Sequence, residues 1–210
     1  MQVCPSPNCG PRRDGLVPQL VVIHFTAMVD VSSALERLCD PAAEVSAHYL
    51  IASDGSVTRM VDESLRAWHA GAGEWAGLTD INSRSIGIEL DNRGTHPFSA
   101  PLMDTLEDLL RGIMTRWDIP AEGIIGHSDM APGRKVDPGP HFDWVRLERQ
   151  GLAAPAVQRP HGDGDAVVFT AAARAAGFTA DVDVDTLLHA TRLRRAPWRT
   201  GALCPADFVL

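Results

Sequence analysis

Three short apolar runs constrain the fold of this chain most strongly. They span residues 20–25 (LVVIHF), 85–90 (SIGIEL) and 123–127 (GIIGH). Runs of this length and composition are typical of strands that are buried on both faces of a sheet. Each run carries a polar side chain at or near its end, namely His24, Glu89 and His127. Because such groups are costly to bury without a partner, we expect them to have a role at the edge of a sheet.

The segments around these runs alternate between strand and helix patterns. Residues 48–61 predict a hairpin, because an Asp-Gly pair in their middle supplies the positive φ angles of a tight turn. Residues 31–39 predict a short helix, and residues 99–118 predict a long one whose apolar side chains recur every three to four positions. Strands and helices mix throughout residues 20–150, which favours an α/β fold with one sheet flanked by helices.

The composition changes after residue 150. Residues 151–165 are rich in Pro and Gly, and two helical patterns follow them. We therefore expect a catalytic or binding domain over residues 1–150, a linker over 151–165 and a small helical region over 166–210.

The overall composition excludes several classes of protein. Lys and Arg total 19 against 27 Asp and Glu, and this acidic balance disfavours a nucleic-acid binder that relies on phosphate contacts. No run of 18 apolar residues is present, so we expect no membrane span. The N-terminus lacks the apolar stretch of a secretory signal, so we expect a cytoplasmic protein, or a periplasmic one if a signal was removed. The four cysteines are too few and too scattered for a disulfide framework.

Two histidines and one carboxylate form a candidate metal site. His24 and His127 end separate apolar runs, and Asp137 follows His127 by ten residues in a proline-rich loop. Two His and one carboxylate with an open fourth position are typical of a catalytic zinc site, where the metal lowers the pKa of bound water to about 7. Because the chain has eight histidines, such a pattern can also arise by chance, and on spacing alone His24 and His127 could equally be ordinary core or surface histidines.

Two further residues fit the same chemistry. Glu89 could act as a general base beside such a water, or simply face solvent at the end of its strand. Lys135 lies two residues before Asp137 and is the single Lys of a chain that otherwise uses Arg. A compact ammonium could stabilise the negative charge that develops when water attacks a carbonyl, and a planar guanidinium is not equivalent to it.

Five segments occur in an order that resembles a known family. They read VVIHFTAM, VSAHYLIASDGSV, AWHAG, NSRSIGIELDNRG and GIIGHSDMAPGRKVDPGPHFDW. Over residues 5–150 the chain resembles the zinc N-acetylmuramoyl-L-alanine amidases of the amidase-2 family, of AmpD and AmiD type, which are related to peptidoglycan-recognition proteins. The resemblance implies a single mixed β-sheet flanked by helices, with a small helical C-terminal appendage that is faintly similar to a peptidoglycan-binding domain.

The resemblance also implies roles for particular residues. One zinc ion per chain would be held by His24, His127 and Asp137. Glu89 would be the catalytic acid and Lys135 the residue that stabilises the oxyanion. His69, in the segment AWHAG, is a candidate either for substrate contact or for a place behind the metal ligands, and Arg134 is a candidate for substrate contact. His48 falls in another of the family's segments, and we expect it to pack in the core.

The implied activity is hydrolysis of the amide between the lactyl group of N-acetylmuramic acid and L-alanine. The expected partners are peptidoglycan fragments, or muropeptides, in bacterial wall turnover and recycling. The short segment between His24 and Ser46 is similar to the AmiD type, which implies acceptance of intact as well as 1,6-anhydro muramoyl substrates. Stem-peptide preference, oligomeric state and protein partners stay open.

Three alternatives accompany this hypothesis. A catalytically inactive peptidoglycan-binding module on the same fold is the first, although such modules have typically lost a zinc ligand. The second is a non-haem iron site built on His127-Ser128-Asp129, an H-x-D motif, but the later histidines follow loop or helical sequence. The third concerns a C-terminal arginine cluster. It could contact glycan or the carboxylates of the stem peptide, but we expect it to form a solvated helix face. Its members are Arg192, Arg194, Arg195 and Arg199.

Overall fold

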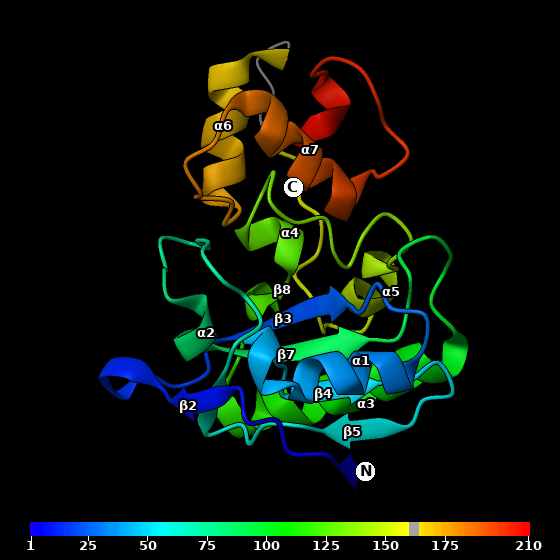
Figure 1. Cartoon of the computed structure of the whole chain (residues 1–210). Helices are drawn as coiled ribbons and strands as arrows, with labels where there is room; N and C mark the ends of the chain where they lie inside the picture. Colours follow the sequence, from blue (N-terminus) through cyan, green and yellow to red (C-terminus); the bar gives the residue numbers. More distant parts are fainter. Residues whose placement is uncertain (160–163) are drawn as a thin grey trace.

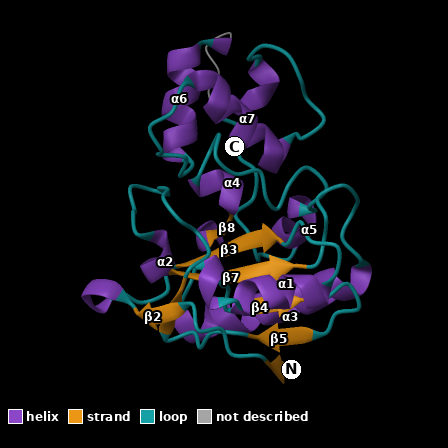
Figure 2. Ribbon diagram, viewed as in Figure 1, coloured by secondary structure: helices purple, strands orange, loops and turns teal. Residues whose placement is uncertain are grey.

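A six-stranded mixed sheet forms the centre of the protein (Figures 1 and 2). The computed structural model describes residues 1–159 and 164–210. The strands lie in the order β1 (Gln2–Val3), β5 (Val57–Arg59), β4 (Tyr49–Ile51), β7 (Ser85–Leu90), β3 (Leu20–Phe25) and β8 (Ile124–Gly126). The pairs β4–β7, β7–β3 and β3–β8 are parallel, and β4 and β5 form the expected antiparallel hairpin. A second, two-stranded ribbon joins β2 (Cys9–Pro11) to β6 (Leu65–Ala67). The predicted fold class is confirmed.

Alternation along β3 directs its side chains to two different layers. Val21 and Ile23 belong to the buried cluster beneath the long helix α3 (Ala100–Trp117), while Leu20 and Val22 belong to the cluster on the other face. Successive side chains of a strand point to opposite faces, so His24 shares the face of Leu20 and Val22. The strand therefore contributes two core residues to each layer and directs its histidine away from α3.

The helices begin and end close to the positions that the sequence indicates. Ser99 caps α3 by accepting a hydrogen bond from the Leu102 amide, and the helix ends at Asp118 in the left-handed conformation. The helix α1 (Val31–Cys39) covers β4 through Ala34 and Leu38, and its N-terminus is capped by Asp30. A short helix, α5 (Trp144–Arg149), follows the proline-rich loop. Two single-turn helices, α2 (Ile81–Arg84) and α4 (His127–Met130), directly precede β7 and follow β8.

The C-terminal helices continue the core of the sheet. The two expected helices are present as α6 (Ala166–Ala175) and α7 (Val184–Arg195), and both lie beyond α4 in Figure 1. Phe169 and Leu187 from these helices share one buried cluster with Val22 and Ile125 of the sheet. Part of the expected linker, residues 160–163, lies outside the described residues, and the domain boundaries stay a prediction.

The C-terminal arginines are not a solvated face, so that expectation is wrong. Arg192 and Arg194 are buried, and each is paired with a buried carboxylate, Asp207 at 2.7 Å and Asp129 at 2.5 Å. Arg195 pairs with Glu148. The helix pattern alone predicted exposure because it does not show the acidic partners, which come from other segments of the chain.

Two expectations about the chain as a whole can be compared directly with the structure. Each of the four cysteines is a free thiol. Across residues 1–159 and 164–210, no helix has the length and the hydrophobicity needed to cross a lipid bilayer.

Candidate metal centre and active site

The strand register brings the predicted site residues to one edge of the sheet. His24 of β3 lies directly opposite Glu89 of β7 in their parallel pairing. On the other side of β3, β8 ends at Gly126, so His127 follows at the same edge as the first residue of α4. Because parallel strands present their carboxyl ends together, three separate segments meet here.

Three side-chain atoms converge at this edge. His24 Nδ1 lies 2.9 Å from His127 Nδ1 and 2.9 Å from Asp137 Oδ2, and His127 Nδ1 lies 3.1 Å from the same oxygen. Both imidazoles are buried, and Asp137 is only 8% exposed. Ser128 fixes the loop by donating its amide hydrogen to the Asp137 carbonyl at 2.9 Å. The structure thus brings together the three residues that the sequence singled out, in a group that could hold a metal ion.

The protonation states of His24 and Asp137 suit a metal. Burial, together with the adjacent His127, lowers the pKa of His24 to about 4, so its imidazole is neutral at pH 7. Burial acts to raise the pKa of Asp137, but the contacts with His127 and His24 outweigh it and lower that pKa below its usual range. Metals bind neutral imidazole and ionised carboxylate, and this donor set is one that zinc takes in catalytic sites.

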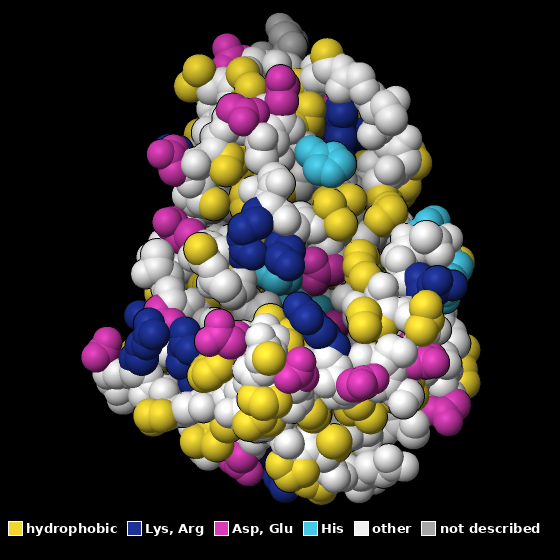
Figure 3. All heavy atoms as spheres, viewed as in Figure 1, with side chains coloured by type: hydrophobic (Ala, Val, Ile, Leu, Met, Phe, Trp, Pro, Cys, Tyr) yellow, Lys and Arg dark blue, Asp and Glu magenta, His cyan; other side chains and the backbone are white. Residues whose placement is uncertain are grey.

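His24, His127 and Asp137 line a cleft with a volume of about 300 Å³. Figure 3 shows His and acidic side chains in a hollow with Lys and Arg side chains on both sides. Glu89, Lys135 and His69 also line the cleft. Further lining comes from α1 and the loop before it, through Met28, Ala34, Arg37 and Leu38.

Glu89 has an unsatisfied atom in this cleft. Its Oε2 is buried and has no hydrogen-bond partner within the described part of the chain. Burial raises the pKa of Glu89 well above its ordinary value, the nearby charge of Asp137 raises it further, and Lys135 opposes the shift. A carboxyl group of this kind suits proton exchange with a water or substrate in the cleft. Glu89 as a whole is half-buried and lines the cleft, so it differs from an ordinary surface glutamate at a strand end.

The other predicted site residues, Lys135, His69 and Arg134, differ in where they lie relative to the cleft. Lys135 is exposed and lines the cleft, and His69 lines it while its Nδ1 lies 3.0 Å from His24 Nε2. Arg134 donates hydrogen bonds to the carbonyls of Ala70 and Ala72 and is absent from the cleft lining of the described residues, so its contact with substrate stays a prediction.

Two further expectations are settled by side-chain contacts. His48 is fully buried and accepts a hydrogen bond from the Gly87 amide at 2.9 Å, which confirms its packing role. Asp129 accepts hydrogen bonds from the Gly126 amide and Arg194, so the H-x-D motif does not bring its two side chains to one metal site.

Sequence reasoning missed the residues that hold the two histidines from behind. Ala70 accepts a hydrogen bond from His127 Nε2 at 2.9 Å, and Asn82 accepts hydrogen bonds from the amides of His69 and Ala70. A backbone carbonyl leaves no trace in the sequence. The only signal for Asn82 was its place in the segment NSRSIGIELDNRG.

Comparison with known proteins identifies the family. Residues 14–140 match the family model described as N-acetylmuramoyl-L-alanine amidase. The amidase AmiD of Escherichia coli is 40% identical over 158 residues, which cover 67% of this chain and 56% of AmiD. The chain therefore spans about half the length of this relative. The 1,6-anhydro-N-acetylmuramyl-L-alanine amidase AmpD of Escherichia coli is 34% identical over 160 residues, which cover 68% of this chain and 87% of AmpD.

Solved structures agree with the sequence relatives. AmiD from E. coli, in complex with the substrate anhydro-N-acetylmuramic acid-L-Ala-D-gamma-Glu-L-Lys, gives a TM-score of 0.81 at 29% identity over 93% of this chain and 89% of that one. AmpDh3 from Pseudomonas aeruginosa, in complex with anhydromuramic pentapeptide, gives 0.80 at 27% identity over 91% and 89%. From this sheet, this cleft and these relatives, the chain belongs to the N-acetylmuramoyl-L-alanine amidase family.

Proposed function

We propose that this chain hydrolyses the amide bond that joins the lactyl group of N-acetylmuramic acid to L-alanine in peptidoglycan fragments. One observation carries the proposal: the group formed by His24, His127 and Asp137 lines the same cleft as Glu89, whose Oε2 has no hydrogen-bond partner among the described residues. The donor group and the carboxyl group are the two parts that metal-assisted hydrolysis needs. The names of AmiD and AmpD describe amidases that act on a muramoyl-L-alanine bond, which supports the choice of this bond.

We infer that one zinc ion binds to His24, His127 and Asp137. When bound, zinc polarises a carbonyl oxygen and lowers the pKa of a coordinated water. The side chain of Asp137 is the single anionic ligand in this group, so the centre keeps a net positive charge and stays electrophilic.

Glu89 moves the proton in this mechanism. Its carboxylate takes a proton from the attacking water and then delivers it to the nitrogen of the departing L-alanine. The pKa of Glu89, raised by burial, suits a group that must hold that proton between the two steps. Among the described residues no protein group donates a hydrogen bond to Oε2, so its acceptor capacity is not used by another part of the chain.

Lys135 supplies the second positive charge. Its ammonium group, at the rim of the cleft, stabilises the negative charge that develops on the lactyl carbonyl oxygen. His69 and Arg134 stay candidates for substrate contact, and the acceptance of intact as well as 1,6-anhydro muramoyl substrates stays a prediction, as do a cytoplasmic location and a role in recycling. The inactive binding module is not favoured, because all five residues of the catalytic hypothesis are present.

Mass spectrometry of defined muropeptides tests this function. The purified chain is incubated with intact and 1,6-anhydro muropeptides, each with and without a zinc chelator. We expect a free sugar and a peptide that begins with L-alanine, abolished by the chelator and restored by zinc. If neither muropeptide were cleaved while the chain held one zinc ion, the proposal would be overturned and the binding module favoured.

A further inference from the structure

Two consecutive residues contact the rear nitrogens of both candidate metal ligands. His69 Nδ1 lies 3.0 Å from His24 Nε2, and the Ala70 carbonyl lies 2.9 Å from His127 Nε2. The front nitrogens, Nδ1 of His24 and Nδ1 of His127, face each other and Asp137. One short segment therefore reaches behind two histidines that are 103 residues apart in sequence.

The hydrogen-bond partners decide which nitrogen of each ring carries the proton. A carbonyl oxygen can only accept, so His127 Nε2 donates to Ala70, and in the neutral ring the Nδ1 atom is then the unprotonated nitrogen. The partner of His24 is another imidazole, which can donate or accept. The direction of that hydrogen bond must therefore be set by what lies on the far side of His69.

On the far side of His69, the chain of hydrogen bonds ends at a second carbonyl. Ser85 Oγ lies 3.2 Å from His69 Nε2 and donates its own hydrogen to the Ile81 carbonyl at 2.6 Å. Because the hydroxyl hydrogen is used there, Ser85 Oγ accepts from His69 Nε2. His69 Nδ1 is then an acceptor, and it receives the proton on His24 Nε2. The Nδ1 atom of His24 is left with its lone pair directed at the metal-binding group.

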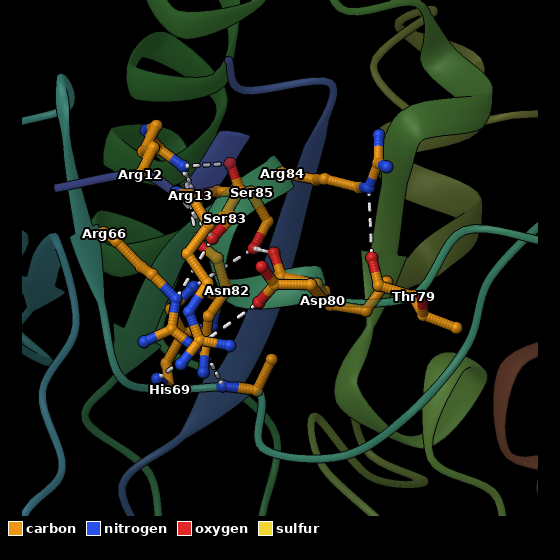
Figure 4. Close-up of polar contacts among 12 residues, drawn as sticks. Arg12, Arg13, Arg66, His69, Thr79, Asp80, Asn82, Ser83, Arg84 and Ser85 are labelled. Atoms are coloured by element: carbon orange, nitrogen blue, oxygen red, sulfur yellow. Dashed lines mark hydrogen bonds and ion pairs between the residues drawn. The ribbon is translucent and has the colours of Figure 1, made fainter. Parts of the chain in front are cut away.

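The segment is itself held in place by a buried amide. Asn82 Oδ1 accepts hydrogen bonds from the His69 amide at 3.0 Å and from the Ala70 amide at 2.8 Å, and Asn82 is only 7% exposed. Figure 4 shows Asn82, Ser85 and His69 gathered in this polar cluster. The ring of His69 also packs on Gly87, where a Cβ atom would lie within 2.4 Å of it, so only glycine leaves room for the ring.

We propose that His69 is a positioning residue that sets the tautomer of His24, and that Asn82 holds His69 and Ala70 so that both histidines present unprotonated Nδ1 atoms to one metal ion. The proposal rests on the zinc site of the proposed function. Groups behind a metal-bound histidine typically change metal affinity by about 10- to 100-fold when they are removed.

Zinc affinity gives the first test. The dissociation constant of the full chain is measured by competition with a chromophoric chelator, so no turnover is needed. We expect His69→Leu to weaken zinc binding by about 10- to 100-fold. His69→Asn keeps an acceptor oxygen near the Nδ1 position and should retain most of the affinity. Likewise, Asn82→Leu should weaken zinc binding, whereas Asn82→Asp, which keeps the acceptor oxygen, should not.

His48→Leu is the matched control. His48 is fully buried, and its ring centroid lies 5.8 Å from that of His69, but it does not contact His24 or His127 in the described contacts. Its replacement should lower the melting temperature and leave the zinc dissociation constant within about threefold. An equal loss of zinc affinity in His48→Leu and His69→Leu would reduce His69 to a structural role and overturn the proposal.

Nitrogen-15 NMR of the histidine rings tests the tautomers directly. In the zinc-loaded wild-type chain we expect His24 and His69 both to be protonated on Nε2. Protonation of His69 on Nδ1 would overturn the proposal. A wild-type chain that binds no zinc at all would instead refute the proposed function, whereas tight zinc binding by His69→Leu would refute only the positioning role.

Discussion

Arg194 donates a hydrogen bond from Nη1 to Asp129 Oδ2 at 2.5 Å, and this pair ties the C-terminal helix α7 to the single-turn helix that begins at His127. Asp129 is fully buried, and its Oδ2 also accepts from the Gly126 amide at 2.8 Å. The guanidinium of Arg194 stacks over Trp144 at 3.9 Å. The C-terminal region thus supports the segment that carries a candidate metal ligand.

Removal of this arginine should destabilise the whole protein. Arg194→Met leaves the Asp129 carboxylate buried without its partner, which typically costs about 3–5 kcal/mol. We expect a loss of that size in the free energy of unfolding, measured by urea denaturation. Arg174→Met, at an exposed position of α6, is the control and should change stability by less than about 0.5 kcal/mol. Similar losses in both variants would contradict the interpretation.

Glu89→Gln should separate metal binding from catalysis. The amide keeps the shape of the side chain but cannot take a proton, so we expect kcat to fall by about 10²- to 10⁴-fold. Zinc content, measured by atomic emission on the same samples, should stay at one per chain because Glu89 is not in the donor group. Parallel loss of zinc and activity would show that Glu89 acts as a ligand instead.

Lys135→Arg should keep the charge and lose most of the rate. A planar guanidinium cannot occupy the position of a compact ammonium, and loss of one stabilising donor for an oxyanion costs about 10²- to 10³-fold in kcat. Arg149→Lys, the reverse exchange at an exposed position of α5, serves as the control and should be silent. Near-normal rates for Lys135→Arg would mean that any cation suffices there.

Acid should selectively weaken the pair between Asp207 and Arg192. Burial acts to raise the pKa of Asp207, but hydrogen bonds from Arg192 and the Cys204 amide lower it to about 2, below the value of about 3.9 for an unfolded Asp. A depressed folded-state pKa contributes stability that is full above pH 4 and is lost as the pH falls from about 4 to 2. The destabilisation caused by Asp207→Asn should therefore be large at pH 7 and shrink toward pH 3 in urea titrations. The exposed control Asp181→Asn should show no such trend.

The positions of His24, Glu89 and His127 could be predicted because each follows from a pattern within one strand. Each residue comes at or just after the end of an apolar run, and parallel strands present such ends at a common edge. Asp137 was identifiable because it follows His127 by ten residues in a proline-rich loop, and Lys135 because it is the single Lys of the chain and lies two residues before Asp137. The long helix 99–118 was equally clear, since its periodicity and its caps are local features.

The environment of α7 could not be predicted in the same way. Its arginines satisfy the pattern of a solvated helix face, yet Arg192 and Arg194 are buried against Asp207 and Asp129. Arg194 and Asp129 are 65 residues apart, and a buried charge can find its partner anywhere along the chain. The helical pattern in residues 183–195 records only how often side chains are polar, not which other segment covers them.

The sequence by itself therefore determined the central strands, the long helix and the candidate residues for metal-assisted hydrolysis. Only the tertiary structure decided how that group is held: by a carbonyl from Ala70, a ring from His69 and a carboxylate of Asp129 bound to Arg194. The physical reason is that apolar periodicity is a property of one element, whereas hydrogen-bond direction and charge pairing depend on atoms that meet only after the chain has folded.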